Sequence, residues 1–300
     1  MKIVFAGTPQ ISALALEIIS EAHEVVLAIT RPDALVGRNR TLTPSPVALK
    51  AGELGIPVVK ANKFDEEVIS EISGSGAQNA VVIAFGAMIP AQALGLLDWW
   101  NIHFSLLPMW RGASPLQHSM MTNGPSGVTI FRLDQGMDTG PVLAQQNIKF
   151  LPSETCGEAL VRFTGIASNL VCDLLTNIPE ATPQAGTTSY AGKIVRADAR
   201  IDWSQPATRI DALVRAMNPE PMAWTEINGK DVKIIRTHLT ETDYGTTKIP
   251  GAVFKDENGA VLVQCGDGKQ IALIELQPSG KGRMPSSDWL NGQNKEIHFG

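Results

Sequence analysis

The sequence predicts an α/β protein with a Rossmann-like, mostly parallel sheet carrying helices on both faces, followed by a small β-barrel of the oligonucleotide-binding (OB) type. Over roughly the first 180 residues, apolar strand-like runs alternate with helical patterns, which indicates a parallel sheet with covering helices. Residues 178–192 are rich in Pro, Thr, Ala and Gly and break this alternation. Short strand-like runs separated by tight-turn residues then recur, which is typical of a small barrel.

These observations predict an α/β domain over residues 1–180, a linker over 181–205 and a β-barrel over 206–300. The hydrophobic content of 44% and charged content of 18% argue against global disorder. The net charge of −5 argues against indiscriminate binding of nucleic acids. The three scattered cysteines lack a zinc-binding spacing, and no apolar run approaches the roughly 18–20 residues of a membrane span. We therefore expect a cytoplasmic protein with no membrane partner and no metal.

The elements of the first domain follow from local patterns. Residues 2–6 form an apolar run that ends in Gly7-Thr8-Pro9, a turn that lacks the dinucleotide-binding fingerprint. The run 79–85 is continuously apolar and β-branched, as in a strand buried on both faces. Further strands are expected at 23–30, 56–59, 99–104, 127–133 and 141–150, with helices near 46–54, 64–73 and 154–177. The last helix is expected to bury Leu160, Phe163, Ile166, Leu170 and Leu174.

Residues 31–46 are expected to form a long loop, punctuated by prolines, that carries Arg31, Arg38 and Arg40. Loops of this length inside compact domains are usually functional or mobile, although a surface insertion without a function is the alternative. In the second domain, one helix is expected at 206–217. The expected strands are 222–228, 231–238, 248–255, 259–264 and 269–276.

Two motifs carry the candidate chemistry. Asn101 and His103 lie two residues apart on an apolar strand, so their side chains point to the same face. Asp138 lies in a turn-rich loop between two strand-like runs. Together the three would supply an amide donor, a switchable acid and a proton acceptor. The alternatives are a histidine satisfied within the core and a plain hairpin turn.

These motifs resemble those of the folate-dependent formyltransferases over nearly the whole chain. The shared segments are FAGTP (5–9), LTPSPV (42–47), FGAMIP (85–90), NIHFSLLPMWRGASP (101–115), DQGMDTGPVL (134–143), the segment 193–203 that begins with KI and ends with IDW, and AMNPEPMAW (216–224). The resemblance implies that Asn101, His103 and Asp138 are the catalytic set. It also implies that the segment Ser105, Leu106, Leu107 and Pro108 binds the folate.

The resemblance is greatest to the branch of the family that acts on methionyl-tRNA. It implies transfer of the formyl group of 10-formyltetrahydrofolate, a co-substrate, to the α-amine of initiator methionyl-tRNA, without a metal. In this mechanism Asn101 and a charged His103 donate to the developing oxyanion, and Asp138 keeps the imidazole charged and helps to remove the amine proton. A monomer is expected.

For the tRNA, the resemblance implies contacts from Arg38 and Arg40 in the 31–46 loop. The barrel is expected to add backbone contacts through Lys193, Arg196, Arg200, Lys230, Lys233 and Arg236. Two departures from the family stand out: QIS follows FAGTP where an aromatic residue is usual, and the basic loop reads GRNRTL where lysines are frequent. The second departure bears on the tRNA contact and not on the catalytic set.

Several alternatives remain open at this stage. A formyltransferase acting on a nucleotide-linked amino sugar would keep the same catalytic set, and a hydrolase releasing formate would use water as the acceptor. A non-catalytic RNA-binding protein could retain only the fold. Gly86, Met88 and Ile89 could form an apolar wall for the pterin ring or be merely packed. Arg111 could meet an anionic group of a substrate or form a structural ion pair.

Overall fold

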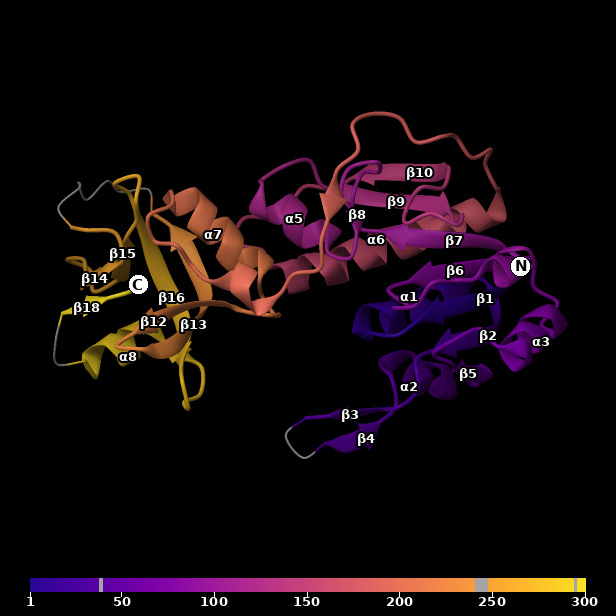
Figure 1. The fold of residues 1–300 in the computed structure, drawn as a ribbon, viewed down its shortest axis with the longest axis horizontal. Helices are drawn as coiled ribbons and strands as arrows, with labels where there is room; N and C mark the ends of the chain where they lie inside the picture. The colour runs from indigo at the N-terminus through magenta and orange to yellow at the C-terminus, as the bar shows by residue number, and fades with distance from the viewer. Residues whose placement is uncertain (38–39, 241–247, 294–295) are drawn as a thin grey trace. The chain divides into compact units, whose positions relative to one another are not determined.

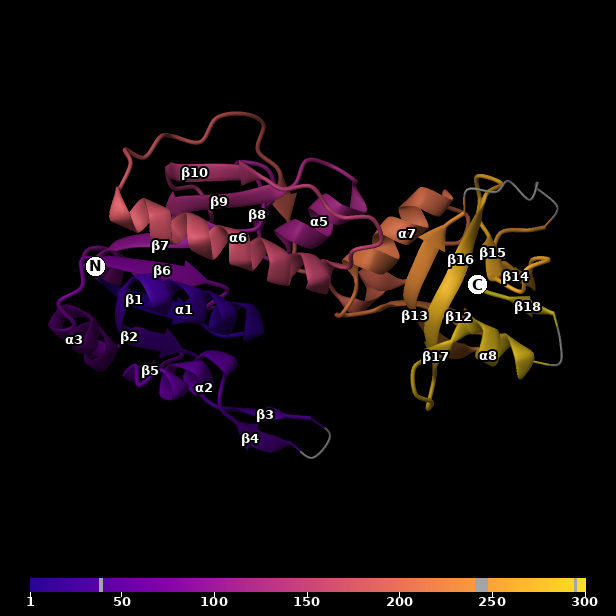
Figure 2. The same cartoon turned by 180° about the vertical axis from the view of Figure 1, so that it is seen from behind.

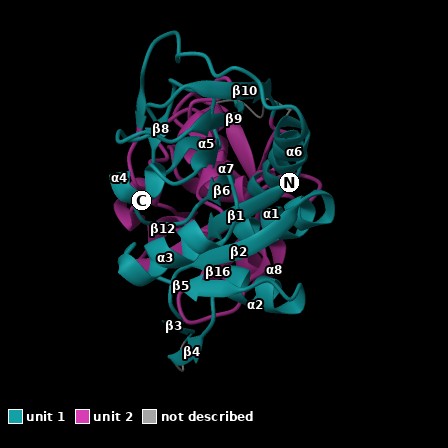
Figure 3. Cartoon of the chain, turned by 90° about the vertical axis from the view of Figure 1, so that its right-hand side faces the viewer, with its two compact units in different colours: residues 1–115, 126–149, 160–190 teal, residues 116–125, 150–159, 191–300 magenta. Residues whose placement is uncertain are grey.

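The computed structural model describes residues 1–37, 40–240, 248–293 and 296–300. The chain forms two compact units (Figure 3): unit 1 comprises residues 1–115, 126–149 and 160–190, and unit 2 comprises 116–125, 150–159 and 191–300. The expected linker is divided between them, with residues 181–190 in unit 1 and 191–205 in unit 2. The units therefore interleave along the sequence.

Unit 1 is built on a seven-stranded sheet with the order β10-β9-β7-β6-β1-β2-β5 (Figure 1). The strands are β1 (Lys2–Gly7), β2 (Glu24–Thr30), β5 (Val58–Lys60), β6 (Asn79–Ile83), β7 (Asp98–His103), β9 (Gly127–Arg132) and β10 (Val142–Asn147). Strands β5, β2, β1, β6 and β7 are parallel, whereas β9 and β10 run antiparallel to their neighbours. The predicted mostly parallel α/β sheet is confirmed, and every residue of β6 is buried as its sequence indicated.

Helices cover both faces of this sheet. Val68 and Ile72 of α3 (Glu66–Gly74) and Ala93 of α4 (Ala91–Leu94) join one apolar cluster with Val4 and Val82 of the sheet. The opposite face carries α1 (Gln10–Ala22) and α6 (Cys156–Thr176), as Figure 2 shows. The helix α2 (Pro46–Glu53) packs against α1.

Capping residues explain where two of these helices begin. The Ser45 hydroxyl accepts a hydrogen bond from the Ala48 N–H before α2, and the Asp65 carboxylate accepts one from the Val68 N–H before α3. Each bond satisfies a backbone donor that a helix start leaves without an intrahelical partner.

The long helix α6 has the predicted extent, but its most buried stripe differs from the predicted one. Phe163, Ala167, Val171 and Leu175 are buried. Of the predicted set only Phe163 is fully buried, and the others are half-buried: Leu160, Ile166, Leu170 and Leu174. By length and mean hydropathy (1.3) α6 could cross a membrane, yet its buried stripe is that of a core helix.

The 31–46 segment contains a β-hairpin, and the prediction of an irregular loop is therefore wrong for much of it. Strand β3 (Ala34–Val36) pairs antiparallel with β4 (Thr41–Thr43). The apolar and β-branched residues of the two strands favour this pairing. Arg40 is exposed near the turn with a positive φ of 48°, whereas Arg38 lies outside the described residues.

Unit 2 contains an antiparallel sheet with the order β12-β13-β16-β15-β14-β18, and β17 pairs with β16. The strands are β12 (Ala223–Ile227), β13 (Lys230–Leu239), β14 (Ala252–Lys255), β15 (Val261–Gln264), β16 (Gln270–Pro278), β17 (Met284–Pro285) and β18 (Ile297–His298). The Gly300 N–H donates to the Glu226 carbonyl at 3.3 Å, so the two ends of the sheet approach each other and the predicted barrel is nearly closed.

Three aromatic rings stack within a largely aliphatic core in unit 2. Phe299 stacks on Trp203 at 5.2 Å and on Trp289 at 5.9 Å between ring centroids. Two helices, α7 (Ala207–Ala216) and α8 (Ser286–Asn291), complete this core, and α5 (Pro115–Met121) lies almost entirely in unit 2.

Candidate active site

The candidate site lies at the carboxyl end of β7, in unit 1. Asn101 pairs in register with Val82 of the neighbouring parallel strand β6, and both strands end at this edge of the sheet. Asn101 is half-buried and His103 is 5% exposed. The carboxyl edge of a parallel sheet is where α/β proteins bind ligands, so the two predicted polar residues occupy the expected place.

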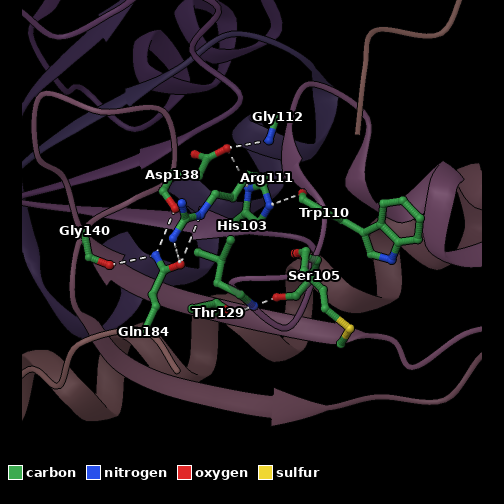
Figure 4. A network of polar contacts seen from close by, with 11 residues as sticks. His103, Ser105, Trp110, Arg111, Gly112, Thr129, Asp138, Gly140 and Gln184 are labelled. Carbon is green, nitrogen blue, oxygen red and sulfur yellow. Dashed lines mark hydrogen bonds and ion pairs between the residues drawn. The ribbon is translucent and has the colours of Figure 1, made fainter. Parts of the chain in front are cut away.

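His103 is held between a carbonyl and a carboxylate (Figure 4). Its Nε2 atom lies 2.9 Å from the Trp110 carbonyl oxygen, which can only accept, so Nε2 carries a proton. Its Nδ1 atom faces Asp138 Oδ2 across 3.7 Å, too far for a direct hydrogen bond. The same carboxylate oxygen accepts the Gly112 N–H at 2.8 Å. The structure thus brings together two residues that lie in different sequence motifs.

Burial decides the charge of the His103 imidazole. It lowers the pKa of His103 below the ordinary value of 6.5, against the opposite effects of the Asp138 carboxylate and the Trp110 carbonyl. The resting imidazole is therefore neutral near pH 7, with an unprotonated Nδ1 facing Asp138. The expectation of a charged His103 is corrected, because the cost of desolvating the cation exceeds the attraction of one carboxylate.

This charge state predicts how stability depends on pH. Between the lowered pKa of folded His103 and 6.5, the unfolded chain binds a proton that the folded protein does not. The free energy of unfolding of the wild type, relative to a His103→Gln variant, should therefore fall as pH falls through this window. The slope should be at most about 1.4 kcal/mol per pH unit. Urea unfolding of both proteins from about pH 8 to pH 5 measures it. A relative gain in wild-type stability at low pH would contradict the neutral imidazole.

A cavity of about 460 Å³ opens beside these residues. Asn101 and Asp138 line it, whereas His103 does not. Its apolar wall comes from the β6–α4 segment and includes the expected Gly86, Met88 and Ile89. The remaining lining residues are Val82, Ala84, Phe85, Ala87, Gly112, Ala113, Leu133, Asp134, Gly136 and Met137.

Two methionines of this lining are largely exposed. Met88 is 64% and Met137 is 59% exposed, and they come from two different loops. Methionine side chains adapt their shape to apolar ligands. The volume and the mixture of an apolar wall with a few polar groups are typical of small-molecule sites.

The predicted folate-binding segment, residues 105–108, follows the lining residue Asn101 closely in the sequence but does not itself line the cavity. Ser105, Leu107 and Pro108 are buried and Leu106 is half-buried. The backbone of the segment is held by the Thr129 hydroxyl, which donates to the Ser105 carbonyl at 2.6 Å and accepts the Leu107 N–H at 3.0 Å. Contact of these four residues with folate stays a prediction.

Gln184 is a member of the site that sequence reasoning missed. Its amide nitrogen donates to the Asp138 and Gly140 carbonyls at 2.9 and 2.8 Å, and its Oε1 atom accepts from Arg111 at 2.7 Å. Among the described residues Arg111 therefore binds a neutral amide and forms no ion pair, and its contact with an anionic group of a substrate stays a prediction. The composition around Gln184 indicated only a linker, and no local pattern marks the residue.

Several basic residues that were expected to contact tRNA are paired within unit 2. Arg196 pairs with Asp231, Arg200 with Glu226 and Arg236 with Glu158. The guanidinium groups of Arg196 and Arg200 also lie 4.3 and 5.4 Å from the ring centroid of Trp224. The remaining three, Lys193, Lys230 and Lys233, make no ion pair within the described part of the chain.

Sequence comparison places this geometry in a family. The family model "Formyl transferase" matches residues 1–174, and "Formyl transferase, C-terminal domain" matches residues 193–294. A methionyl-tRNA formyltransferase of Arthrobacter sp. (strain FB24) is 42% identical over 301 residues, covering 98% of this chain and 97% of the relative.

Solved structures share the fold at low sequence identity. The methionyl-tRNA formyltransferase of Clostridium thermocellum superposes with a TM-score of 0.61 at 16% identity, covering 94% of this chain and 100% of that one. An N-formyltransferase of Helicobacter canadensis, in complex with folinic acid and dTDP-3-aminofucose, superposes with a TM-score of 0.68 at 20% identity, covering 93% and 99%. On the full-length sequence match and the two family models, the chain belongs to the formyl transferase family.

Proposed function

We propose that this protein transfers the formyl group of 10-formyltetrahydrofolate to the α-amino group of initiator methionyl-tRNA, in the cytoplasm and as a monomer. The observation that carries the proposal is the meeting of Asn101, His103 and Asp138 beside one cavity. The 42% identity to a methionyl-tRNA formyltransferase over nearly the whole chain supports this acceptor over an amino sugar.

The reaction requires a proton acceptor beside the attacking amine. The neutral amine attacks the formyl carbon, a new C–N bond forms and the carbonyl oxygen becomes an oxyanion. The amine proton then leaves, the bond between the formyl carbon and N10 of the folate breaks, and N10 takes up a proton. The products are N-formylmethionyl-tRNA and tetrahydrofolate. An α-amine with a pKa of about 7.7–8.0 is partly neutral near pH 7, so no strong base is needed to prepare it.

The pair of His103 and Asp138 suits the acceptor role. Nδ1 of the neutral imidazole and Oδ2 of Asp138 face each other at 3.7 Å without a proton between them. A proton that leaves the amine can be taken up by this pair, directly or through one water. The uptake turns a repulsion between two lone pairs into an attraction between an imidazolium and a carboxylate, which favours the forward step.

Asn101 suits the oxyanion role. Its half-buried amide faces the cavity and makes no side-chain hydrogen bond with the described residues. An amide donor already in place where charge develops stabilises the transition state without reorganisation. The apolar wall of Gly86, Met88 and Ile89 fits the flat pterin ring of the donor. Ser105, Leu106, Leu107 and Pro108 are proposed to contact the same folate from their neighbouring loop.

The exposed hairpin β3–β4 is proposed to contact the tRNA through Arg38 and Arg40. Arg40→Ala is then expected to raise KM for methionyl-tRNA several-fold and to weaken its salt dependence, because one phosphate contact is lost. The KM for 10-formyltetrahydrofolate should not change. Steady-state kinetics at two salt concentrations measure both effects, with Lys63→Ala, elsewhere on unit 1, as the matched control. An equal loss for both substrates would remove the hairpin from the tRNA interface.

The deciding experiment compares acceptors. The purified protein is given 10-formyltetrahydrofolate with methionyl-initiator tRNA, with a nucleotide-linked amino sugar or with water alone. N-formylmethionyl-tRNA should form and the other two reactions should be negligible. Formylation of the amino sugar alone would establish the sugar-modifying alternative, and release of formate in all three would establish a hydrolase. Binding of RNA without any of these reactions would establish the non-catalytic RNA-binding alternative.

A further inference from the structure

We propose that Gln184 is a positioning residue that sets the spacing between His103 and Asp138, and this proposal rests on the proposed function. The four hydrogen-bonding capacities of its side-chain amide are all used. The nitrogen donates to the carbonyls of Asp138 and Gly140, and the oxygen accepts from Arg111 Nε at 3.2 Å and from Nη2 at 2.7 Å. Gln184 thereby joins the loop that carries Asp138 to the loop that follows His103 (Figure 4).

The loop around Asp138 needs such support. Asp138 has a positive φ of 55°, which is unfavourable for a residue with a side chain. At Gly140 the backbone packs so closely that a Cβ atom would lie 1.8 Å from the Arg132 carbonyl oxygen. Gln184 binds the carbonyls of both residues, so it holds the backbone on each side of Thr139.

The other end of Gln184 acts on His103. Arg111 lies between Trp110, whose carbonyl accepts from His103, and Gly112, whose N–H donates to Asp138. Ser189 also fixes this segment. Its hydroxyl oxygen accepts the Trp110 N–H and its carbonyl accepts the Arg111 N–H, both at 2.9 Å. Fixing Arg111 therefore fixes both backbone groups that orient the catalytic pair. The segment 184–189 serves the active site and is not a free connector.

The chemistry explains why the residue is a glutamine. A glutamate at 184 would keep the bond to Arg111 but would place a carboxylate oxygen against the two carbonyl oxygens of Asp138 and Gly140. An alanine would leave all three partners without this bond. Glutamine is the side chain of this length that can donate on one side and accept on the other.

The first test is kinetic. In Gln184→Ala and Gln184→Glu, kcat for formyl transfer should fall about 10–100-fold, because a misplacement near 1 Å has this scale of effect. The KM for methionyl-tRNA should stay within about two-fold of the wild type. Gln146→Ala is the matched control, since Gln146 is exposed on β10 of the same unit and should leave kcat unchanged. Wild-type kcat in both Gln184 variants would overturn the proposal.

A double-mutant cycle separates positioning from general destabilisation. In an Asp138→Ala background, Gln184→Ala should add little further loss in single-turnover rate, because the group that it positions is already absent. An equal loss in both backgrounds would show that Gln184 does not act through Asp138 and would overturn the proposal.

A third readout does not depend on activity. Nuclear magnetic resonance of labelled histidine follows the titration of His103, and in Gln184→Ala the pKa of His103 should move toward its ordinary value as the imidazole loses its fixed, buried place. An unchanged titration would overturn the proposal. If the wild type formylates no acceptor, the proposed function fails. The titration still shows whether Gln184 positions His103, because it does not depend on activity.

Discussion

Replacing Asp138 with asparagine is expected to lower kcat for formyl transfer by about 10²–10⁴-fold, the range for loss of a general base. The change keeps the size of the side chain but removes the negative charge that faces His103 Nδ1 across 3.7 Å and would stabilise the imidazolium formed on proton uptake. The amide oxygen can still accept the Gly112 N–H, which the carboxylate accepts at 2.8 Å, so the loop should stay folded. Steady-state kinetics with saturating methionyl-tRNA measure the loss, and thermal unfolding checks the fold.

The matched control is Asp173→Asn, which removes an exposed carboxylate from α6 in the same unit. It should retain wild-type kcat, which would exclude an effect of net charge. If Asp138→Asn also retained wild-type kcat, Asp138 would be a capping residue of the loop, as in the alternative interpretation of its motif.

Replacing Asn101 with alanine is expected to lower kcat by about 10²–10³-fold, the usual cost of removing one donor to an oxyanion. The amide lines the cavity and is not engaged by another described side chain. Its removal therefore acts on the transition state more than on the fold. The KM values should change little, since the donor is needed only once charge has developed on the formyl oxygen.

Two further variants sharpen this prediction. Asn101→Asp keeps the shape but replaces the donor by an acceptor with a negative charge, so its kcat should be at least as low as that of the alanine variant. Asn147→Ala, at an exposed position of β10, should behave like the wild type. A large rise in KM for 10-formyltetrahydrofolate with an unchanged kcat would make Asn101 a binding residue instead.

Much of the fold could be predicted because the responsible forces are local. The continuous apolar run that becomes β6 and the helical periodicity of α6 identify their elements without knowledge of their partners. Asn101 and His103 share a face because side chains alternate along any strand. Tight-turn residues mark the barrel strands in the same way. The hairpin β3–β4 was missed because three-residue strands give too short a pattern.

The sequence by itself therefore determined the α/β sheet, the barrel and the identity of the candidate catalytic residues, since periodicity and motifs are properties of neighbouring positions. Only the tertiary structure decided that His103 is neutral, because its pKa depends on burial by distant residues. It also decided that Gln184 joins the site, through bonds to residues 73 and 46 positions away. Such contacts depend on how distant loops pack against each other, and local sequence patterns do not predict that packing.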